Sequence, residues 1–100
     1  MTYANACDKL NGRDSRKVGN NTYLERIDSQ TVGVRLHRTH VVTIHADGSY
    51  TLNSGGWRTV TTKSRINDYA PARVTQRAGE WFVRHDGTEI EFRDGMTLTA

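Results

Sequence analysis

The sequence is poor in cysteine, proline and aromatic residues, and it has no long hydrophobic run. Its 100 residues include one cysteine, one proline, two phenylalanines and two tryptophans. A single cysteine, Cys7, cannot form an internal disulfide, which suits a reducing compartment. The mean hydropathy of −0.71 and the lack of an extended apolar stretch argue against a membrane-spanning helix. The first residues also lack the apolar segment of a secretory signal.

The residues that are present suit a small folded protein. Hydrophobic residues make up 35% of the chain and charged residues 25%, which are proportions of a globular protein rather than a disordered one. A chain of this length can bury one modest core. We therefore predict a single domain over residues 1–100, in which residues 1–20 form a peripheral helix and a basic loop.

The charge is unevenly distributed along the chain. The net charge is +3. Residues 1–40 contain seven Lys or Arg against four Asp or Glu, residues 41–78 contain five against two, and residues 79–100 contain two against five. A basic surface attracts phosphate-bearing partners, whereas the acidic end suits a basic partner protein. A solvated, soluble surface is an equally good interpretation of the same charges.

Hydrophobic periodicity predicts two helices and many strands. Apolar residues on one helical face predict a helix over residues 2–11 that ends at Gly12, followed by a polar, basic loop up to residue 21. A second helix is predicted over residues 62–69, with Thr61 or Thr62 as its N-cap and Pro71 at its end. Apolar alternation and β-rich composition predict strands at residues 22–27, 32–37, 40–45, 50–52, 57–61, 73–77, 81–83, 89–92 and 96–99.

Glycine-containing pairs mark the connections between these strands. Tight turns are predicted at Asp47-Gly48, Ala78-Gly79, Asp86-Gly87 and Asp94-Gly95. Short connections favour a meander of neighbouring strands. The predicted fold class is therefore α+β, with a mainly antiparallel twisted β-sheet, one short central helix and an N-terminal helix. The sequence leaves open whether the sheet curls into a half-barrel.

Residues 53–67 contain the densest set of candidate ligand-binding groups in the sequence, because they combine a glycine pair, an aromatic ring, hydroxyls and cations. The glycine pair could expose backbone N–H groups to an anion, a helix start binds phosphate, and Trp57 could stack on a base. The segment lacks the pattern of an NTPase P-loop. In the architectural alternative, the glycines only bend the chain and Trp57 belongs to the core. The candidate ligand-binding residues here are Trp57, Arg58, Thr61, Thr62, Lys63 and Arg65.

Arg16 and Lys17 in the basic loop are the other predicted nucleic-acid contacts, with a solvated linker as the alternative. The histidines have no metal-binding spacing, and no acidic residue stands at a recognisable catalytic spacing from any of them; they are His37, His40, His45 and His85. We therefore predict no metal, no cofactor and no catalysis, and a small nuclease or phosphodiesterase is the remaining enzymatic alternative.

Four blocks of the sequence resemble a widespread family of small tailed-phage and prophage proteins. The blocks are Asn20–Leu24, Val34–Thr39, Leu52–Lys63 and Phe92–Met96. The resemblance implies a setting, the cytoplasm of an infected bacterium, and no catalytic residues. In that setting we predict non-catalytic binding of nucleic acid or of a phosphate-bearing nucleotide; the alternative is a host-takeover or counter-defence protein that binds and inhibits a host protein. No membrane partner is expected, and unpaired sheet edges allow a homodimer.

Overall fold

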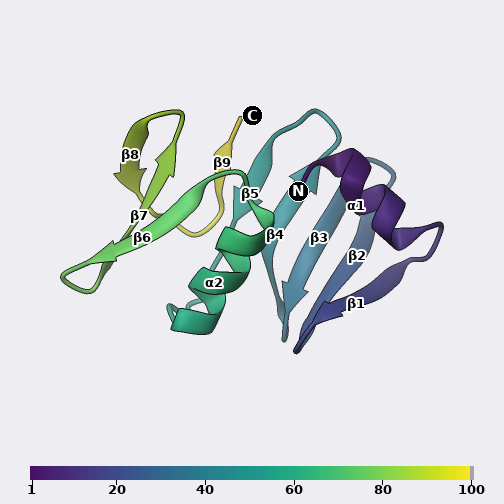
Figure 1. Ribbon diagram of the computed structural model, residues 1–100, viewed down its shortest axis with the longest axis horizontal. Helices are drawn as coiled ribbons and strands as arrows, with labels where there is room; N and C mark the ends of the chain where they lie inside the picture. Colours follow the sequence, from purple (N-terminus) through teal and green to yellow (C-terminus); the bar gives the residue numbers. More distant parts are fainter. Residues whose placement is uncertain (100) are drawn as a thin grey trace.

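A computed structural model describes residues 1–99, which form two helices and nine strands. Six strands make one antiparallel sheet in the order β1-β2-β3-β4-β5-β9, and β6-β7-β8 make a second, smaller sheet (Figure 1). The large sheet is open, with β1 and β9 at its edges. The predicted α+β class is therefore confirmed, without closure into a barrel. The strands are β1 (Ser15–Gly19), β2 (Thr22–Asp28), β3 (Thr31–Leu36), β4 (Thr39–His45), β5 (Tyr50–Leu52), β6 (Arg73–Arg77), β7 (Glu80–His85), β8 (Thr88–Glu91) and β9 (Met96–Leu98).

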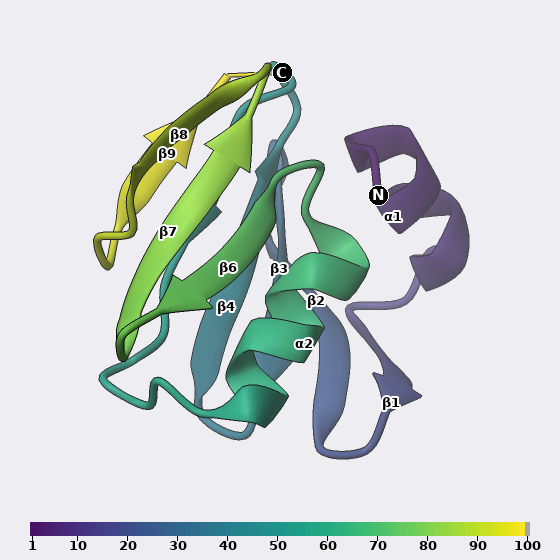
Figure 2. The same cartoon turned by 60° about the vertical axis from the view of Figure 1, so that its left-hand side comes forward.

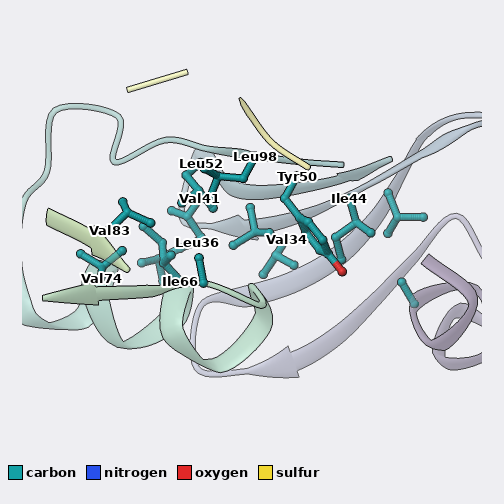
Figure 3. Packing of buried hydrophobic residues seen from close by; sticks show 14 of the residues in the cluster. Val34, Leu36, Val41, Ile44, Tyr50, Leu52, Ile66, Val74, Val83 and Leu98 are labelled. Carbon is teal, nitrogen blue, oxygen red and sulfur yellow. The ribbon is translucent and has the colours of Figure 1, made fainter. Parts of the chain in front are cut away.

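Both helices, α1 (Tyr3–Leu10) and α2 (Val60–Tyr69), lie against the same face of the large sheet (Figures 1 and 2). Ile66 of α2 and Val74 and Val83 of the small sheet pack with the inward-facing residues of the large sheet (Figure 3). Burying each such side chain contributes about 1.5–3 kcal/mol. One apolar cluster thus joins both sheets and both helices, and the opposite face of the large sheet carries the polar residues.

Helix α1 has a capping box at its start. The Thr2 hydroxyl accepts the N–H of Asn5 at 3.1 Å, and the Asn5 side chain accepts the N–H of Thr2 at 3.4 Å. Asn11 closes the helix in the left-handed conformation, with φ of 50°, and Gly12 follows with φ of 80°. The predicted helix is confirmed, but its left-handed cap is Asn11 and not Gly12. Asn is the usual substitute for Gly at this position.

The polar segment predicted as a loop contains strand β1, so that prediction was wrong for Ser15–Gly19. Its backbone pairs with β2 in a register that places Arg16 opposite Leu24. The side chains of Ser15, Arg16 and Lys17 are exposed, so the strand has no apolar alternation by which it could be found. Charged side chains on an edge strand discourage pairing with a second chain.

Strand β4 contains an extra residue, Val41. The β3–β4 register changes between Val34 opposite Val42 and Arg35 opposite His40, which leaves Val41 without a partner on β3. Val41 and Val42 are consequently both buried. Simple alternation along a strand would place these two neighbours on opposite faces; the β-bulge shifts the strand by one residue and so buries both.

Residues 57–61 were predicted as a strand, but α2 already begins at Val60. Thr59 is its N-cap, and the Thr59 hydroxyl accepts the N–H of Thr62 at 3.2 Å. The cap is therefore neither Thr61 nor Thr62. β-branched residues favour strands, but here burial of Thr62 and Ile66 beneath the helix outweighs that preference. The end of the helix at Tyr69, two residues before Pro71, agrees with the prediction.

Candidate ligand-binding groove

A groove of about 590 Å³ opens at the end of the large sheet where α2 begins. The turn between β3 and β4 forms one wall, and the segment between β5 and α2 forms the other. Leu36 and Val41 supply an apolar floor. Grooves of this volume, with an apolar floor and a few polar groups, are typical of small-ligand sites. The other lining residues are His37, Arg38, Thr39, Ser54, Trp57, Thr59, Thr61 and Thr62.

The turn between β3 and β4 is held by hydrogen bonds on both sides. His37 has φ of 55°, and its N–H donates to the carbonyl of Asn21 at 2.9 Å. The carbonyl of His37 accepts a bond from Nη1 of Arg35 at 2.6 Å. These bonds fix the backbone of the wall, while the side chain of Arg38 stays exposed beside the groove.

The opposite wall depends on the glycine pair. Gly55 has φ of 63°, and a Cβ atom there would lie within van der Waals overlap of the Thr39 hydroxyl. Only glycine allows this backbone to pass so close to β4. The N–H of Gly55 donates to Asn53 Oδ1 at 2.7 Å, and that of Gly56 donates to Ser54 Oγ at 3.2 Å. Both amides are therefore paired within the segment, and the glycines serve as a bend rather than as the predicted anion-binding amides.

Trp57 follows this bend and stands at the rim of the groove. Its side chain is 70% exposed, so the architectural alternative that placed Trp57 in the core was wrong. The buried tryptophan is Trp81, which packs edge-on against Phe92 with 5.3 Å between ring centroids. An indole that is not needed in the core and borders a groove is available to a ligand.

The first turn of α2 completes the groove. Thr62 and Lys63 donate their N–H groups to Thr59, at 3.2 Å to its hydroxyl and 3.1 Å to its carbonyl. The N–H groups of Val60 and Thr61 precede these in the first turn, where a helix has no internal acceptors. The same end of the helix carries partial positive charge. The start of α2 therefore offers hydrogen-bond donors and a favourable field beside the threonine hydroxyls.

The predicted cations of this segment do not line the groove. Arg58 lies over the rings of Trp81 and Phe92, with its guanidinium carbon 5.7 and 5.1 Å from the ring centroids. Lys63 donates from Nζ to Gln76 Oε1 at 3.2 Å. The cation at the groove is Arg38. It lies in the two-residue turn between β3 and β4, outside residues 53–67.

The remaining predicted cations, Arg65 on α2 and Arg16 and Lys17 on β1, also lie outside the groove lining. Arg65 donates from Nε to the hydroxyl of Thr22 at 2.9 Å. Arg16 and Lys17 line a second hollow of about 270 Å³, together with Lys9, Val18 and Tyr69. The structure thus places five of the predicted binding residues in two separate hollows, whereas Arg58, Lys63 and Arg65 line neither. Trp57, Thr61 and Thr62 belong to the groove, and Arg16 and Lys17 belong to the second hollow.

The histidines are dispersed. His40 contacts Glu25 at 2.9 Å, and His45 contacts the hydroxyl of Thr51 at 2.9 Å. Burial raises the pKa of Glu25, but hydrogen bonds from His40 and Arg35 outweigh that effect, and the pKa is lowered overall. Within residues 1–99, His, Cys, Asp and Glu form no group of three that could hold a metal ion.

The fold and the groove define a class: a small α+β protein with a ligand-sized hollow whose floor is apolar and whose walls carry hydroxyls and one guanidinium. The family model of the Kyanoviridae Gp96 protein matches residues 2–99. The chain belongs to this phage protein family, which confirms the resemblance to small phage proteins. Searches of the curated proteins and of the solved structures found no match. No helix formed by residues 1–99 is long and apolar enough to cross a membrane.

Proposed function

We propose that this phage protein binds a nucleotide unit without catalysis, with the base stacked on Trp57 and a phosphate at the start of α2. One observation carries the proposal: the Trp57 indole is 70% exposed beside a groove with an apolar floor. Stacking of a base on an aromatic ring contributes about 1–3 kcal/mol. That is enough to favour a nucleotide over inorganic phosphate in the same groove.

The phosphate has suitable partners on the adjoining wall. Amides at a helix start and threonine hydroxyls bind phosphate oxygens, and the guanidinium of Arg38 adds a charge that matches their geometry. The described lining contains neither Asp nor Glu, so a phosphate there meets no like charge. The same chemistry serves a free nucleotide and one unit of a single-stranded nucleic acid.

Calorimetry at low salt tests this proposal with three ligands: a nucleoside monophosphate, a cyclic nucleotide and a short oligothymidylate. We expect binding by at least one of them, with Trp57→Ala weakening it about 5- to 150-fold, the equivalent of a lost stacking contact. Trp57→Phe should recover part of the loss, because a smaller ring still stacks. Thr43→Ala, on strand β4 but outside the groove lining, is the control and should bind like the wild type. The absence of heat with all three ligands would contradict the proposal.

A second candidate function is the binding and inhibition of a host protein. The observation that favours it is the exposure of two large hydrophobic side chains close together in the sequence, Trp57 and Val60, of which Val60 is 77% exposed. Exposed aromatic and aliphatic side chains of this kind anchor protein interfaces. Affinity capture from infected cells distinguishes the two functions. A host protein retained by the wild type but lost by Val60→Asp would support inhibition, whereas recovery of nucleic acid alone would count against it.

A further inference from the structure

The groove and the second hollow open along the same side of α2. Thr61 lines the groove and Tyr69 lines the second hollow. Arg65 lies between them in the helix. Residues four apart on a helix lie above one another on one face, so Thr61, Arg65 and Tyr69 form a continuous line from one hollow to the other. Lys63 lies on the opposite side of the helix, where it contacts Gln76 of β6.

The second hollow has the composition of a phosphate site. Three of its five lining residues are cations, Lys9, Arg16 and Lys17, and none is acidic. Arg16 is held in place because its Nη1 donates to the carbonyl of Lys9 at 2.7 Å, at the end of α1. Burial raises the pKa of Tyr69, so its hydroxyl keeps its proton and can donate to an anion.

Arg65 is positioned to bridge the two hollows. Its Nε is fixed to Thr22, a fully buried residue at the start of β2. Its Nη1 lies 3.7 Å from the carboxylate of Asp68, a side chain that is 55% exposed. This separation is longer than a hydrogen bond. The outer nitrogens of the guanidinium thus make an ion pair with an exposed carboxylate rather than a hydrogen bond, and a phosphate that passes along the helix can compete with that carboxylate for them.

We infer that the ligand is a short single-stranded oligonucleotide that runs along this side of α2. One base stacks on Trp57, and phosphates farther along the strand lie against Arg65 and then against Lys9, Arg16 and Lys17. This inference rests on the proposed function and specifies its ligand. The helix rises by about 12 Å from Thr61 to Tyr69. At about 3.4 Å per nucleotide of a stacked strand, this distance corresponds to roughly four nucleotides.

A length series of oligothymidylates tests the inference by calorimetry, from thymidine monophosphate to about eight nucleotides. We expect affinity to rise up to four or five nucleotides and then to level off. The double variant Arg16→Gln/Lys17→Gln should weaken binding of the longer strands about tenfold or more. It should also lower the salt dependence, by roughly 0.7 in the slope for each lost phosphate contact. Its affinity for the monophosphate should be unchanged.

Lys63→Gln is the matched control, because it removes one positive charge from the opposite side of the same helix. It should bind every length like the wild type. Asp68→Asn provides a change in the other direction: removing the carboxylate beside Arg65 should strengthen binding of the longer strands severalfold. This gain cannot be mistaken for a folding defect.

The outcomes separate the two proposals. If the monophosphate and the longest strand bind with equal affinity, the oligonucleotide inference is overturned and nucleotide binding stands. The same conclusion follows if Arg16→Gln/Lys17→Gln behaves like Lys63→Gln, or if Asp68→Asn has no effect. If no member of the series binds but the cyclic nucleotide does, the oligonucleotide inference alone is overturned. If the cyclic nucleotide also fails to bind, both the inference and the proposed function fail.

Discussion

Asp94 Oδ1 accepts two hydrogen bonds from Ser54, one from its backbone N–H and one from its hydroxyl, both at 2.7 Å. The two residues are 40 positions apart in the sequence. Ser54 is 1% exposed and lines the groove just after β5. The N–H of Gly95 adds a bond to the carbonyl of Leu52 at 2.8 Å. One wall of the groove is therefore fastened to the turn that precedes β9.

Asp94→Ala should destabilise the protein by about 1–3 kcal/mol, because it leaves the hydroxyl and N–H of a buried Ser54 without their acceptor. Urea unfolding followed by circular dichroism measures the change. Glu80→Ala removes an exposed carboxylate from β7 and is the control, with an expected change near zero. Equal midpoints for the two variants would show that the Asp94–Ser54 contact does not stabilise the fold.

Gly33→Ala should also destabilise the protein, by about 1–3 kcal/mol. A Cβ atom at Gly33 would lie 2.6 Å from the His40 ring and 2.9 Å from the end of Ile27. Both side chains cover this glycine on the polar face of the large sheet, so one of them must move. Gly19→Ala is the matched control, because its added Cβ would make ordinary contacts of 3.6 Å with Thr22. Thermal unfolding of the two variants should show a clear loss for Gly33→Ala and a small effect for Gly19→Ala.

The stability of the fold should fall in acid partly because of Glu25. Its pKa is lowered from the ordinary value of 4.5, since hydrogen bonds from His40 and Arg35 outweigh the effect of burial. A lowered pKa in the folded state stabilises the protein above the unfolded pKa, and this contribution is lost as the pH falls through the folded value. Glu25→Gln should therefore flatten the decline in stability below about pH 4.5.

Urea midpoints measured at several pH values check this prediction. Both proteins contain the other carboxylates whose pKa values are lowered, Asp28, Asp47 and Glu89, so the difference between the two curves isolates Glu25. Parallel curves for the wild type and Glu25→Gln would contradict the prediction.

Arg58→Ala should lower stability and leave nucleotide affinity unchanged. The Arg58 guanidinium lies over the rings of Trp81 and Phe92, a contact that contributes about 0.5–1 kcal/mol at an exposed site. Paired measurements of unfolding and of nucleotide affinity check both halves. Arg38→Ala should show the opposite result, with weaker binding and unchanged stability, because Arg38 is exposed beside the groove. A loss of affinity in Arg58→Ala would return Arg58 to the binding site.

The regular parts of this fold could be predicted because local signals are strong there. Asp47-Gly48 and Asp86-Gly87 lie in turns at the expected places, with positive φ at both glycines. Pro71 follows the end of α2 as expected. The failures occurred where tertiary contacts decide the structure. Strand β1 exists through backbone pairing with β2, and the start of α2 depends on burial of Thr62 and Ile66, neither of which is visible in local composition.

The groove could be predicted only in part, for a topological reason. Trp57, Thr61 and Thr62 were found because they are close together in the sequence. Arg38 was missed, although a signal for it existed. In an antiparallel meander, the connection after β3 and the connection after β5 emerge at the same end of the sheet, which brings residues 37–38 next to residues 53–59. Combining the predicted meander with the polar character of both connections would have located Arg38.

The bulge at Val41 has a practical consequence for engineering. It divides β4 into two parts whose side chains alternate in opposite phase. Thr39, before the bulge, lines the groove, whereas Val42 and Ile44, after it, are fully buried. A library that randomises Arg38, which is exposed in the turn before Thr39, would therefore alter the lining of the groove without changing the buried residues of β4. The bulge thus separates the end of the strand that borders the groove from the part that is buried in the core.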